Sequence, residues 1–327
     1  MPIYLAKRIV NYAILLLIAV TLAYFLAATQ LNPRVLYELR NPPLDPVSVE
    51  NSLRALNLSD QVPVLERFIT WAKGVFMHWD WGSSPQGGSV NEEIGRRVFV
   101  SLRLVVMGAF IGMAGGVSLG AWTATRQYKF SDRAISIISL IIISTPAMVI
   151  AILLQVMAVN FNQTFNSQFF EFMGETGQVG NYPGAEIVDR LQHLLLPTIS
   201  MSLGGIASYS RYQRNLMLDT LGADYVRTAR AKGLRKGAAV RRHALRTALI
   251  PMGTYFAFAV AGLVLGASIT ERVYSWHGMG IYGVESIQKN DVHGTVAVVA
   301  FSGTATLTGA FLSDVLVAII DPRVRVS

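Results

Sequence analysis

The sequence contains no cysteine and few charged residues. Because none of its 327 residues is Cys, a disulfide framework, thiolate catalysis and any cysteine-ligated metal site are excluded. Only 15% of the residues are charged, against about 25% in an average soluble domain. Hydrophobic residues make up 52%, and the mean hydropathy is +0.42. A disordered or collagen-like chain is therefore excluded, and an unusually apolar enzyme or a polytopic membrane protein remains.

Long apolar runs decide between these two classes. A helix needs about 20 mostly apolar residues to cross a bilayer, and six runs approach or exceed that length, with most charged residues between them. We therefore predict an all-α membrane protein with six transmembrane helices and both termini on one side. The predicted spans are 9–28, 102–125, 134–160, 194–210, 249–269 and 295–320. The predicted regions are a first helix in 1–30, an extracytoplasmic segment in 31–97 and a five-helix core in 98–327.

The distribution of basic residues predicts the orientation. The side that carries both termini and the loops 126–133 and 211–248 holds 17 Lys and Arg residues and five acidic residues. The opposite side holds 11 basic and 15 acidic residues. Lys and Arg collect in cytoplasmic loops. We therefore expect a plasma-membrane protein with both termini on the cytoplasmic side.

The loop 211–248 is the most informative segment. It holds ten basic and two acidic residues. Asp224 is a candidate N-cap for a short helix that runs to Lys232, and Gly233 suits the position after a helix, where φ is often positive. A second helix is expected from near Lys236. The basic charge alone agrees with attraction to anionic lipid, but small residues such as Ala229 favour a docking surface for a cytoplasmic protein.

The same loop resembles a known family. Its Tyr-Val-Arg-Thr-Ala-Arg-Ala-Lys-Gly-Leu stretch, residues 225–234, resembles the Glu-Ala-Ala loop of ABC importer permeases of the dipeptide and oligopeptide branch. The segments 80–84, 243–251, 275–280 and 321–325 resemble the same branch, although Arg246 replaces a proline of the general pattern and His277 replaces another. The resemblance covers nearly the whole chain and is closest to the first membrane subunit of oligopeptide permeases.

This resemblance implies a type I importer fold and a function in peptide uptake. The chain has no Gly-x-x-x-x-Gly-Lys-Ser/Thr phosphate loop, so ATP and Mg²⁺ are expected in separate ATPase subunits and no cofactor in this chain. The implied partners are those ATPases, a homologous permease, an extracytoplasmic binding protein, membrane lipid and a peptide, but no nucleic acid. The residues expected to form the ATPase-coupling loop are Asp224, Arg227, Thr228, Ala229, Lys232, Gly233, Leu234, His243 and Arg246.

Three residues are candidates for the pathway or its gate. Pro146 interrupts the third predicted span, where it removes a backbone donor and is expected to kink the helix. Glu271 lies where the fifth span is expected to emerge, and Trp276 lies in the glycine-rich loop that follows. Glycines at 108, 112, 116 and 120 predict a flat helix face, for which ordinary packing and a sliding seam both remain open.

Other functions are alternatives to peptide import. A membrane-embedded hydrolase needs facing polar groups at membrane depth, and Ser144, Thr145 and Asp314 form no obvious set. A secondary transporter usually needs acids near the midplane. An importer of the same branch for a nickel chelate, a sugar or glutathione also remains possible. No two histidines lie at the helical spacing of a metal-ligand pair, and no metal site is predicted.

Overall fold

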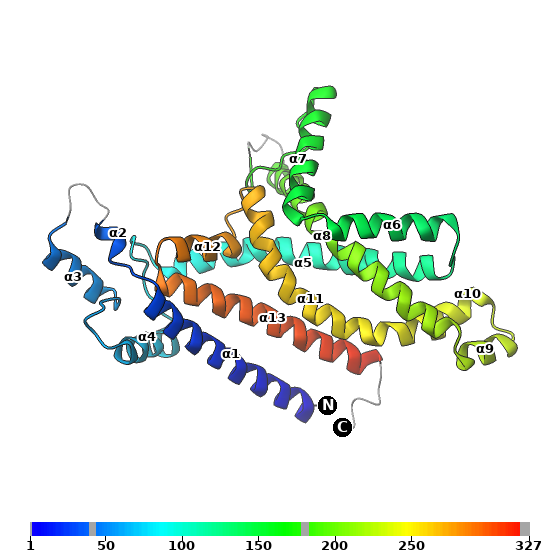
Figure 1. Cartoon of the computed structure of the whole chain (residues 1–327), viewed down its shortest axis with the longest axis horizontal. Helices are drawn as coiled ribbons and strands as arrows, with labels where there is room; N and C mark the ends of the chain where they lie inside the picture. Colours follow the sequence, from blue (N-terminus) through cyan, green and yellow to red (C-terminus); the bar gives the residue numbers. More distant parts are fainter. Residues whose placement is uncertain (1, 39–43, 178–182, 321–327) are drawn as a thin grey trace. The chain divides into compact units, whose positions relative to one another are not determined.

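The computed structural model describes residues 2–38, 44–177 and 183–320. Within these residues the chain is helical, and the one β pairing is an isolated antiparallel bridge between Ser83 and Ser89. Figure 1 labels the helices along the chain. They are α1 (Pro2–Gln30), α2 (Val35–Glu38), α3 (Pro46–Ala55), α4 (Val64–His78), α5 (Val90–Ala124), α6 (Phe130–Ser144), α7 (Ala147–Thr164), α8 (Ala185–Leu221), α9 (Asp224–Ala231), α10 (Lys236–Ala239), a π-helical turn η1 (Val240–Ala244), α11 (Leu245–Val273), α12 (Met279–Gln288) and α13 (Val292–Ile320).

The chain forms two compact units. The first unit comprises Met1–Leu5, Arg103–Trp276 and Thr306–Ser327, and the second comprises Ala6–Leu102 and His277–Ala305. Helices α5 and α13 each contribute residues to both units. The predicted loop 211–248 and the pathway candidates lie in the first unit, and most of the predicted segment 31–97 lies in the second.

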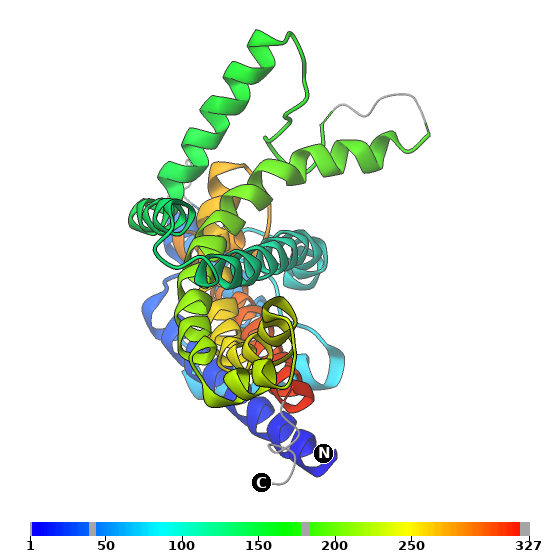
Figure 2. The same ribbon diagram turned by 90° about the vertical axis from the view of Figure 1, so that its right-hand side faces the viewer.

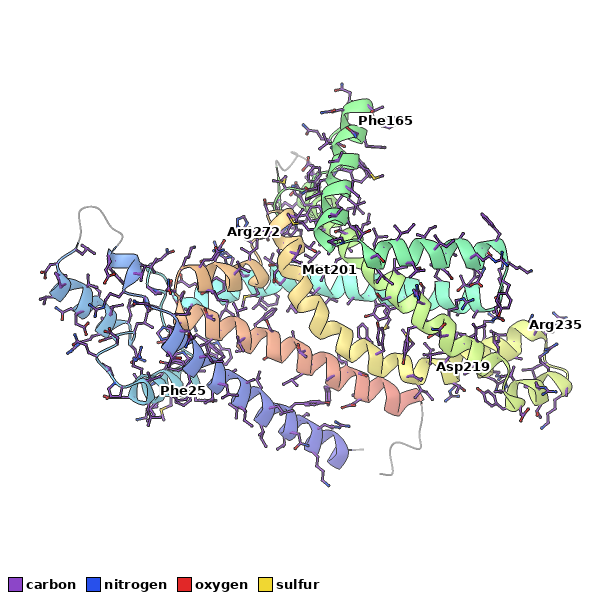
Figure 3. All side chains as sticks on the ribbon, in the orientation of Figure 1. Phe25, Phe165, Met201, Asp219, Arg235 and Arg272 are labelled. Carbon is purple, nitrogen blue, oxygen red and sulfur yellow. The ribbon has the colours of Figure 1, made fainter. Side chains whose placement is uncertain are left out.

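Helix α8 is the centre of the first unit. Helices α6, α7 and α11 all pack against it, and the glycine face of α5 does the same. A Cβ on Gly112 would lie 3.4 Å from the Cα of Gly205, and one on Gly116 would lie 2.5 Å from the Cβ of Tyr209. Met201, labelled in Figure 3, lies on α8 and covers Gly108. The glycine face is therefore a site of close packing.

The third predicted span is two helices rather than one kinked helix. Helix α6 ends at Ser144, and α7 begins at Ala147 with Pro146 as its N-cap, at φ −55° and ψ 138°. These dihedral angles are extended, as is usual for an N-cap residue. The backbone of such a residue is not helical, although its carbonyl O accepts the first hydrogen bond of the helix. In Figures 1 and 2, α7 runs in a direction sharply different from that of α6. The expectation of a kink within a continuous helix was wrong.

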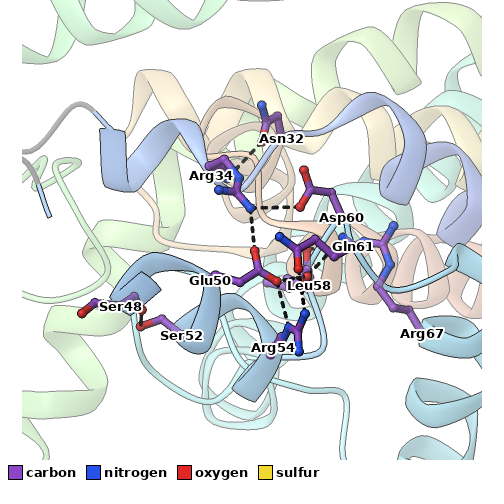
Figure 4. A network of polar contacts seen from close by, with 11 residues as sticks. Asn32, Arg34, Ser48, Glu50, Ser52, Arg54, Leu58, Asp60, Gln61 and Arg67 are labelled. Carbon is purple, nitrogen blue, oxygen red and sulfur yellow. Dashed lines mark hydrogen bonds and ion pairs between the residues drawn. The ribbon is translucent and has the colours of Figure 1, made fainter. Parts of the chain in front are cut away.

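The second unit has a core of its own between α1 and the helices that follow it. The rings of Tyr24 and Trp71 lie with their centroids 4.9 Å apart, and both side chains are buried. A polar network in the same unit joins the segments after α1, as Figure 4 shows. There Arg34 donates to Glu50 at 2.6 Å, and Ser59 donates to the same carboxylate at 2.5 Å. The described residues of the predicted segment 31–97 are thus a folded part of the chain.

Four helical stretches of the described residues have the length and apolar composition to cross a membrane. They contain the first predicted span, all but the last residue of the second, most of the sixth and the second half of the third. The fourth and fifth predicted spans lie within α8 and α11. The four stretches are Ala6–Glu38, Val90–Ala124, Ala147–Thr164 and Val292–Val315.

Candidate functional site

The loop between α8 and α11 folds as a helical hairpin, which we call the α9–α10 hairpin (residues 222–244). Gly233 follows α9 with φ +93°, a conformation that residues with a Cβ adopt at a cost. The N–H of Leu234 donates to the carbonyl O of Ala229, and that of Gly233 to the carbonyl O of Arg230. These two bonds form a Schellman motif. The predicted glycine break and the start of the second helix at Lys236 are confirmed.

The predicted cap of α9 was wrong by one residue. Ala223 is the N-cap, at φ −69° and ψ 146°, and its methyl side chain cannot accept a hydrogen bond from the first turn of the helix. Asp224 is the first helical residue instead. Its carboxylate still favours the positive end of the helix dipole and lies 3.7 Å from the guanidinium of Arg227. The Asp224 side chain is 97% exposed and the Arg227 side chain 77% exposed.

An apolar cluster holds the hairpin against the ends of the long helices. Val226 contributes from α9 and Leu234 from the glycine break, whereas Met217 lies on α8 and Ala124 at the end of α5. Burial of apolar surface of this kind stabilises a fold by about 25 cal/mol for each Å². The buried members are Ala124, Met217, Val226, Ala239, Ala244 and Ala248.

The packing assigns different roles to the predicted coupling residues. Ala231 and Gly233 are exposed, as a docking surface requires, whereas Ala229 is only 9% exposed and Ala239 is fully buried, and for these last two residues the expectation of an outer surface was wrong. They allow close packing inside the hairpin. The exposed face of α9 carries Arg227 and Thr228. Of the other predicted residues, Lys232, Gly233 and Arg246 are exposed, and Leu234 and His243 are half-buried.

An ion pair between α6 and α8 lies next to the hairpin. Arg214 donates to both carboxylate oxygens of Asp132, at 2.6 and 2.8 Å, and the N–H of Tyr128 donates to one of them at 3.0 Å. The hydrogen bonds from Arg214 hold the pKa of Asp132 below its ordinary value. The Asp132 side chain is 3% exposed. A buried bidentate pair of this kind fixes the two elements at one distance and orientation.

A groove with basic residues along its rim lies beside the hairpin. Its volume is about 700 Å³, and we call it the basic groove. Arg126 lies over the ring of Trp122, with 4.4 Å from its Cζ to the ring centroid. Within the described residues, no carboxylate lies at ion-pair distance from any of its four cations. The groove is formed by Ala121, Trp122, Thr125, Arg126, Lys129, Lys236, Gly237, Val240, Arg241 and Leu245.

Two of the pathway candidates lie inside the chain. The side chain of Glu271 has no exposed surface, and Trp276 is 2% exposed. The N–H of Trp276 donates to the carbonyl O of Glu271 at 2.8 Å, which closes the end of α11. The Glu271 side chain is therefore enclosed within this chain, and its predicted place at the end of the fifth span stays a prediction. The helix continues to Val273, and the chain after it covers this last turn.

Some polar residues of this region escaped the sequence analysis. Asp132 and Arg214 are 82 positions apart, and no local pattern pairs them. Gln213 is fully buried on α8, and its amide atoms have no hydrogen-bond partner within the described residues. Tyr209 and Met217, one helical turn before and after it on the same face, are the local signal that it faces the interior.

The chain is similar to known transport proteins over nearly its whole length. The model of the family described as "Binding-protein-dependent transport system inner membrane component" matches residues 116–326. Oligopeptide transport system permease protein OppB of Mycobacterium tuberculosis is 44% identical over 325 residues, which are 99% of this chain and 99% of that protein. Dipeptide transport system permease protein DppB of Bacillus subtilis is 30% identical over 281 residues, covering 85% of this chain and 84% of that protein.

A solved structure shares the fold. An inward facing conformation of the MetNI methionine ABC transporter superposes with a TM-score of 0.50 at 17% identity, covering 70% of this chain and 96% of the other.

Proposed function

Because this chain belongs to the family of inner membrane components of binding-protein-dependent ABC importers, we propose that it is one membrane subunit of an oligopeptide importer. Membership of this family makes the chain a multi-pass membrane protein and a transport subunit rather than an enzyme. The observation that carries the proposal is the 44% identity with an oligopeptide permease over 99% of both chains. Dipeptides are the nearest related cargo, as the name of the Bacillus relative indicates.

The α9–α10 hairpin is the part that contacts the ATPase. Its inner face is occupied by the apolar cluster, whereas Arg227 and Thr228 face outward with no part of the described chain over them. Because the apolar cluster fixes α9 to the ends of the long helices, a displacement of α9 by the ATPase is passed on to those helices. Movement of an ATPase subunit against this helix drives the change between inward-facing and outward-facing states, because the two states differ in their contacts with it.

The topology that this function requires has six crossings and cytoplasmic termini. The excess of basic residues around the hairpin supports the cytoplasmic location of residues 211–248. The segment 31–97 then lies outside, where its polar network faces water, and residues 98–327 form the permease core. The last basic residues, Arg323 and Arg325, lie outside the described residues.

The proposed assembly has several other members. A homologous permease completes the pathway, two ATPase sites hold ATP and Mg²⁺, and an extracytoplasmic binding protein delivers the peptide. This chain itself holds no part of the nucleotide chemistry, since it lacks a phosphate loop. The bacterial plasma membrane, the location named in the family description as the inner membrane, is the expected site.

Anionic membrane lipid is a further partner at the cytoplasmic face. In the basic groove, Lys129 and Arg241 are exposed cations beside an apolar floor that includes Val240. A lipid phosphate fits the cations and an acyl chain fits the floor. Each basic residue near an anionic membrane surface contributes about 1 kcal/mol to such binding.

Reconstitution tests the proposed transport function. The chain, its partner permease, the ATPases and the binding protein are purified together and placed in liposomes, and ATP-dependent uptake of labelled peptides is measured. We expect uptake of oligopeptides. Uptake of a nickel chelate, a sugar or glutathione, with no uptake of any peptide, would contradict the cargo while preserving the fold assignment.

A pair of bulky substitutions tests the coupling surface. Thr228→Trp places an indole on the exposed face of α9 without entering the apolar cluster, so we expect loss of the ATPase from the purified complex. Thr125→Trp makes the same change at the end of α5 and should leave the ATPase bound. Equal retention in both variants would contradict the assignment of α9 as the docking helix.

A further inference from the structure

Three side chains capable of binding a metal converge at the start of α8. Asp189 and His193 lie four positions apart on one face of the helix, and Glu171 comes from the segment before it. One potential ligand atom from each residue lies within 4.8 Å of the others. Asp189 is 5% exposed and His193 is 3% exposed. A His with two carboxylates is a donor set of the kind that binds Zn²⁺.

The distances in this cluster suit a metal better than an ion pair. The Nδ1 of His193 lies 3.4 Å from Oδ1 of Asp189 and 3.6 Å from Oε2 of Glu171. A charged hydrogen bond would bring such atoms to about 2.7–2.9 Å. Ligands about 2.0–2.2 Å from a tetrahedral Zn²⁺ lie roughly 3.3–3.6 Å from one another. Two of the three separations therefore match those of ligands around one ion, and the third, between the two carboxylates, is within 4.8 Å.

The charges of the cluster also favour a divalent cation. Two carboxylates bring two negative charges, and burial makes such charges unfavourable when they are not balanced. Within the described residues, no Lys or Arg lies at ion-pair distance from Glu171 or Asp189. Protonation of His193 would balance one of the two charges, whereas a divalent cation balances both.

The backbone around the cluster is shaped to its ligands. The N–H of Gly177 lies 3.0 and 3.2 Å from the two oxygens of Asp189 and donates to this carboxylate. A Cβ on Gly177 would lie 2.8 Å from Oε2 of Glu171 and 2.9 Å from Cε1 of His193. Only a glycine leaves room here. A backbone donor that orients a ligating carboxylate is a common outer contact of metal sites.

We propose that Glu171, Asp189 and His193 bind a divalent transition metal ion, with Zn²⁺ as the expected occupant and water at the fourth position. The Nδ1 of His193 also lies 2.9 Å from the backbone carbonyl O of Asp189, to which it donates when it carries a proton. Binding of the ion at Nδ1 releases that proton to solvent and breaks this hydrogen bond, because the single in-plane position of Nδ1 cannot serve both. The ion would join the segment after α7 to the first turns of α8.

Direct binding of Zn²⁺ to the purified, detergent-solubilised transporter complex tests this site. The complex is stripped with a chelator, dialysed against ZnCl₂ and analysed for metal by mass spectrometry, with the zinc content of the partner subunits measured alone and subtracted. We expect one ion per copy of this chain and a raised unfolding temperature. Co²⁺ in place of Zn²⁺ should give the intense visible absorption of a tetrahedral site. No ion bound at micromolar Zn²⁺, or binding without that spectrum, would overturn the proposal.

Variants locate the ion within the chain. His193→Gln and Glu171→Gln should each lower the affinity for Zn²⁺ at least 10-fold, and Gly177→Ala should lower it through crowding alone. Exposed residues of the same types provide the controls: His78→Gln and Glu186→Gln should bind as the native chain does. If a buried variant fails to fold, the Co²⁺ spectrum of the native complex still decides. Equal affinity in the folded site variants and the controls would overturn the proposal.

Discussion

The positive φ of Gly233 allows the backbone conformation of the hairpin to be tested without changing its contacts. Gly233 has φ +93°, and a Cβ built on it meets no atom within 4 Å. Gly233→Ala therefore adds no collision, and its whole effect comes from the backbone. An L-residue in this conformation is less stable by about 1–2 kcal/mol, which lowers the ratio of correctly folded to distorted hairpin by a factor of roughly 5–30.

The assay is peptide-stimulated ATP hydrolysis by the reconstituted complex, read together with its thermal unfolding. Gly233→Ala should reduce the stimulated rate and leave the basal rate of the ATPase unchanged. Gly237→Ala is the matched control, because a Cβ there also meets open space but the residue lies in α10 without a positive φ. Ala is favoured over Gly in a helix by about 1 kcal/mol, so this control should keep or improve coupling.

A second substitution separates conformation from contact. Asn adopts the left-handed region more readily than other residues with a Cβ, so Gly233→Asn should restore much of the coupling lost in Gly233→Ala. If Asn proves as harmful as Ala, the requirement at Gly233 is for space against a partner, and the conformational reasoning is refuted. If neither change alters coupling, the glycine break has no role in transmission.

The other predictions concern the surroundings of the hairpin. Asp132→Asn should lower the free energy of unfolding by about 3 kcal/mol, because it leaves the guanidinium of Arg214 without its buried carboxylate. Since the pKa of Asp132 is lowered in the folded chain, the native stabilisation should be complete above the ordinary carboxyl pKa and lost as the pH falls through the lowered one; unfolding temperatures across this range measure both effects. Gly116→Ala should destabilise the chain by about 1–3 kcal/mol through overpacking against α8, measured in the same way. Glutamine at the four cations of the basic groove should weaken binding of the purified complex to anionic nanodiscs, relative to neutral ones.

Each of these has a control of the same chemistry. Asp219→Asn removes an acid from α8 outside the ion pair and should leave the pH dependence unchanged. Gly204→Ala adds a Cβ to α8 where nothing lies within 4 Å and should be tolerated. Arg235→Gln, at the hairpin tip seen in Figure 3, removes a cation outside the basic groove. Equal effects in a variant and its control would contradict the local explanation.

The parts of the fold that depend on local chemistry could be predicted from the sequence. Apolar runs located the long helices, and Gly233 and Lys236 marked the break and the restart of the hairpin, because Gly233 needs a positive φ and the second helix begins three residues later. The break at Pro146 was placed correctly, but its size was underestimated. A proline can kink a helix or end it, and packing of the two halves against α8 and α11 decides which.

Contacts between distant segments could not be predicted. Nothing near Asp132 in the sequence indicates Arg214, and the burial of Glu271 depends on how the following loop folds back. Asp189 and His193 lie four positions apart in the sequence, which places them on one helix face. Only pairs of histidines were considered as metal ligands, so this pair of a carboxylate and a histidine was not predicted. The role of Glu171 depends on the course of the segment between α7 and α8.

The close contact of α5 with α8 has a consequence for movement. At Gly112 and Gly205 the two backbones lie against each other without side chains between them. A change in the distance between the two helices at this point would either make the backbones collide or open a gap that no side chain fills. We therefore expect the described part of α5 from Arg103 onward and α8 to move together when the hairpin is displaced.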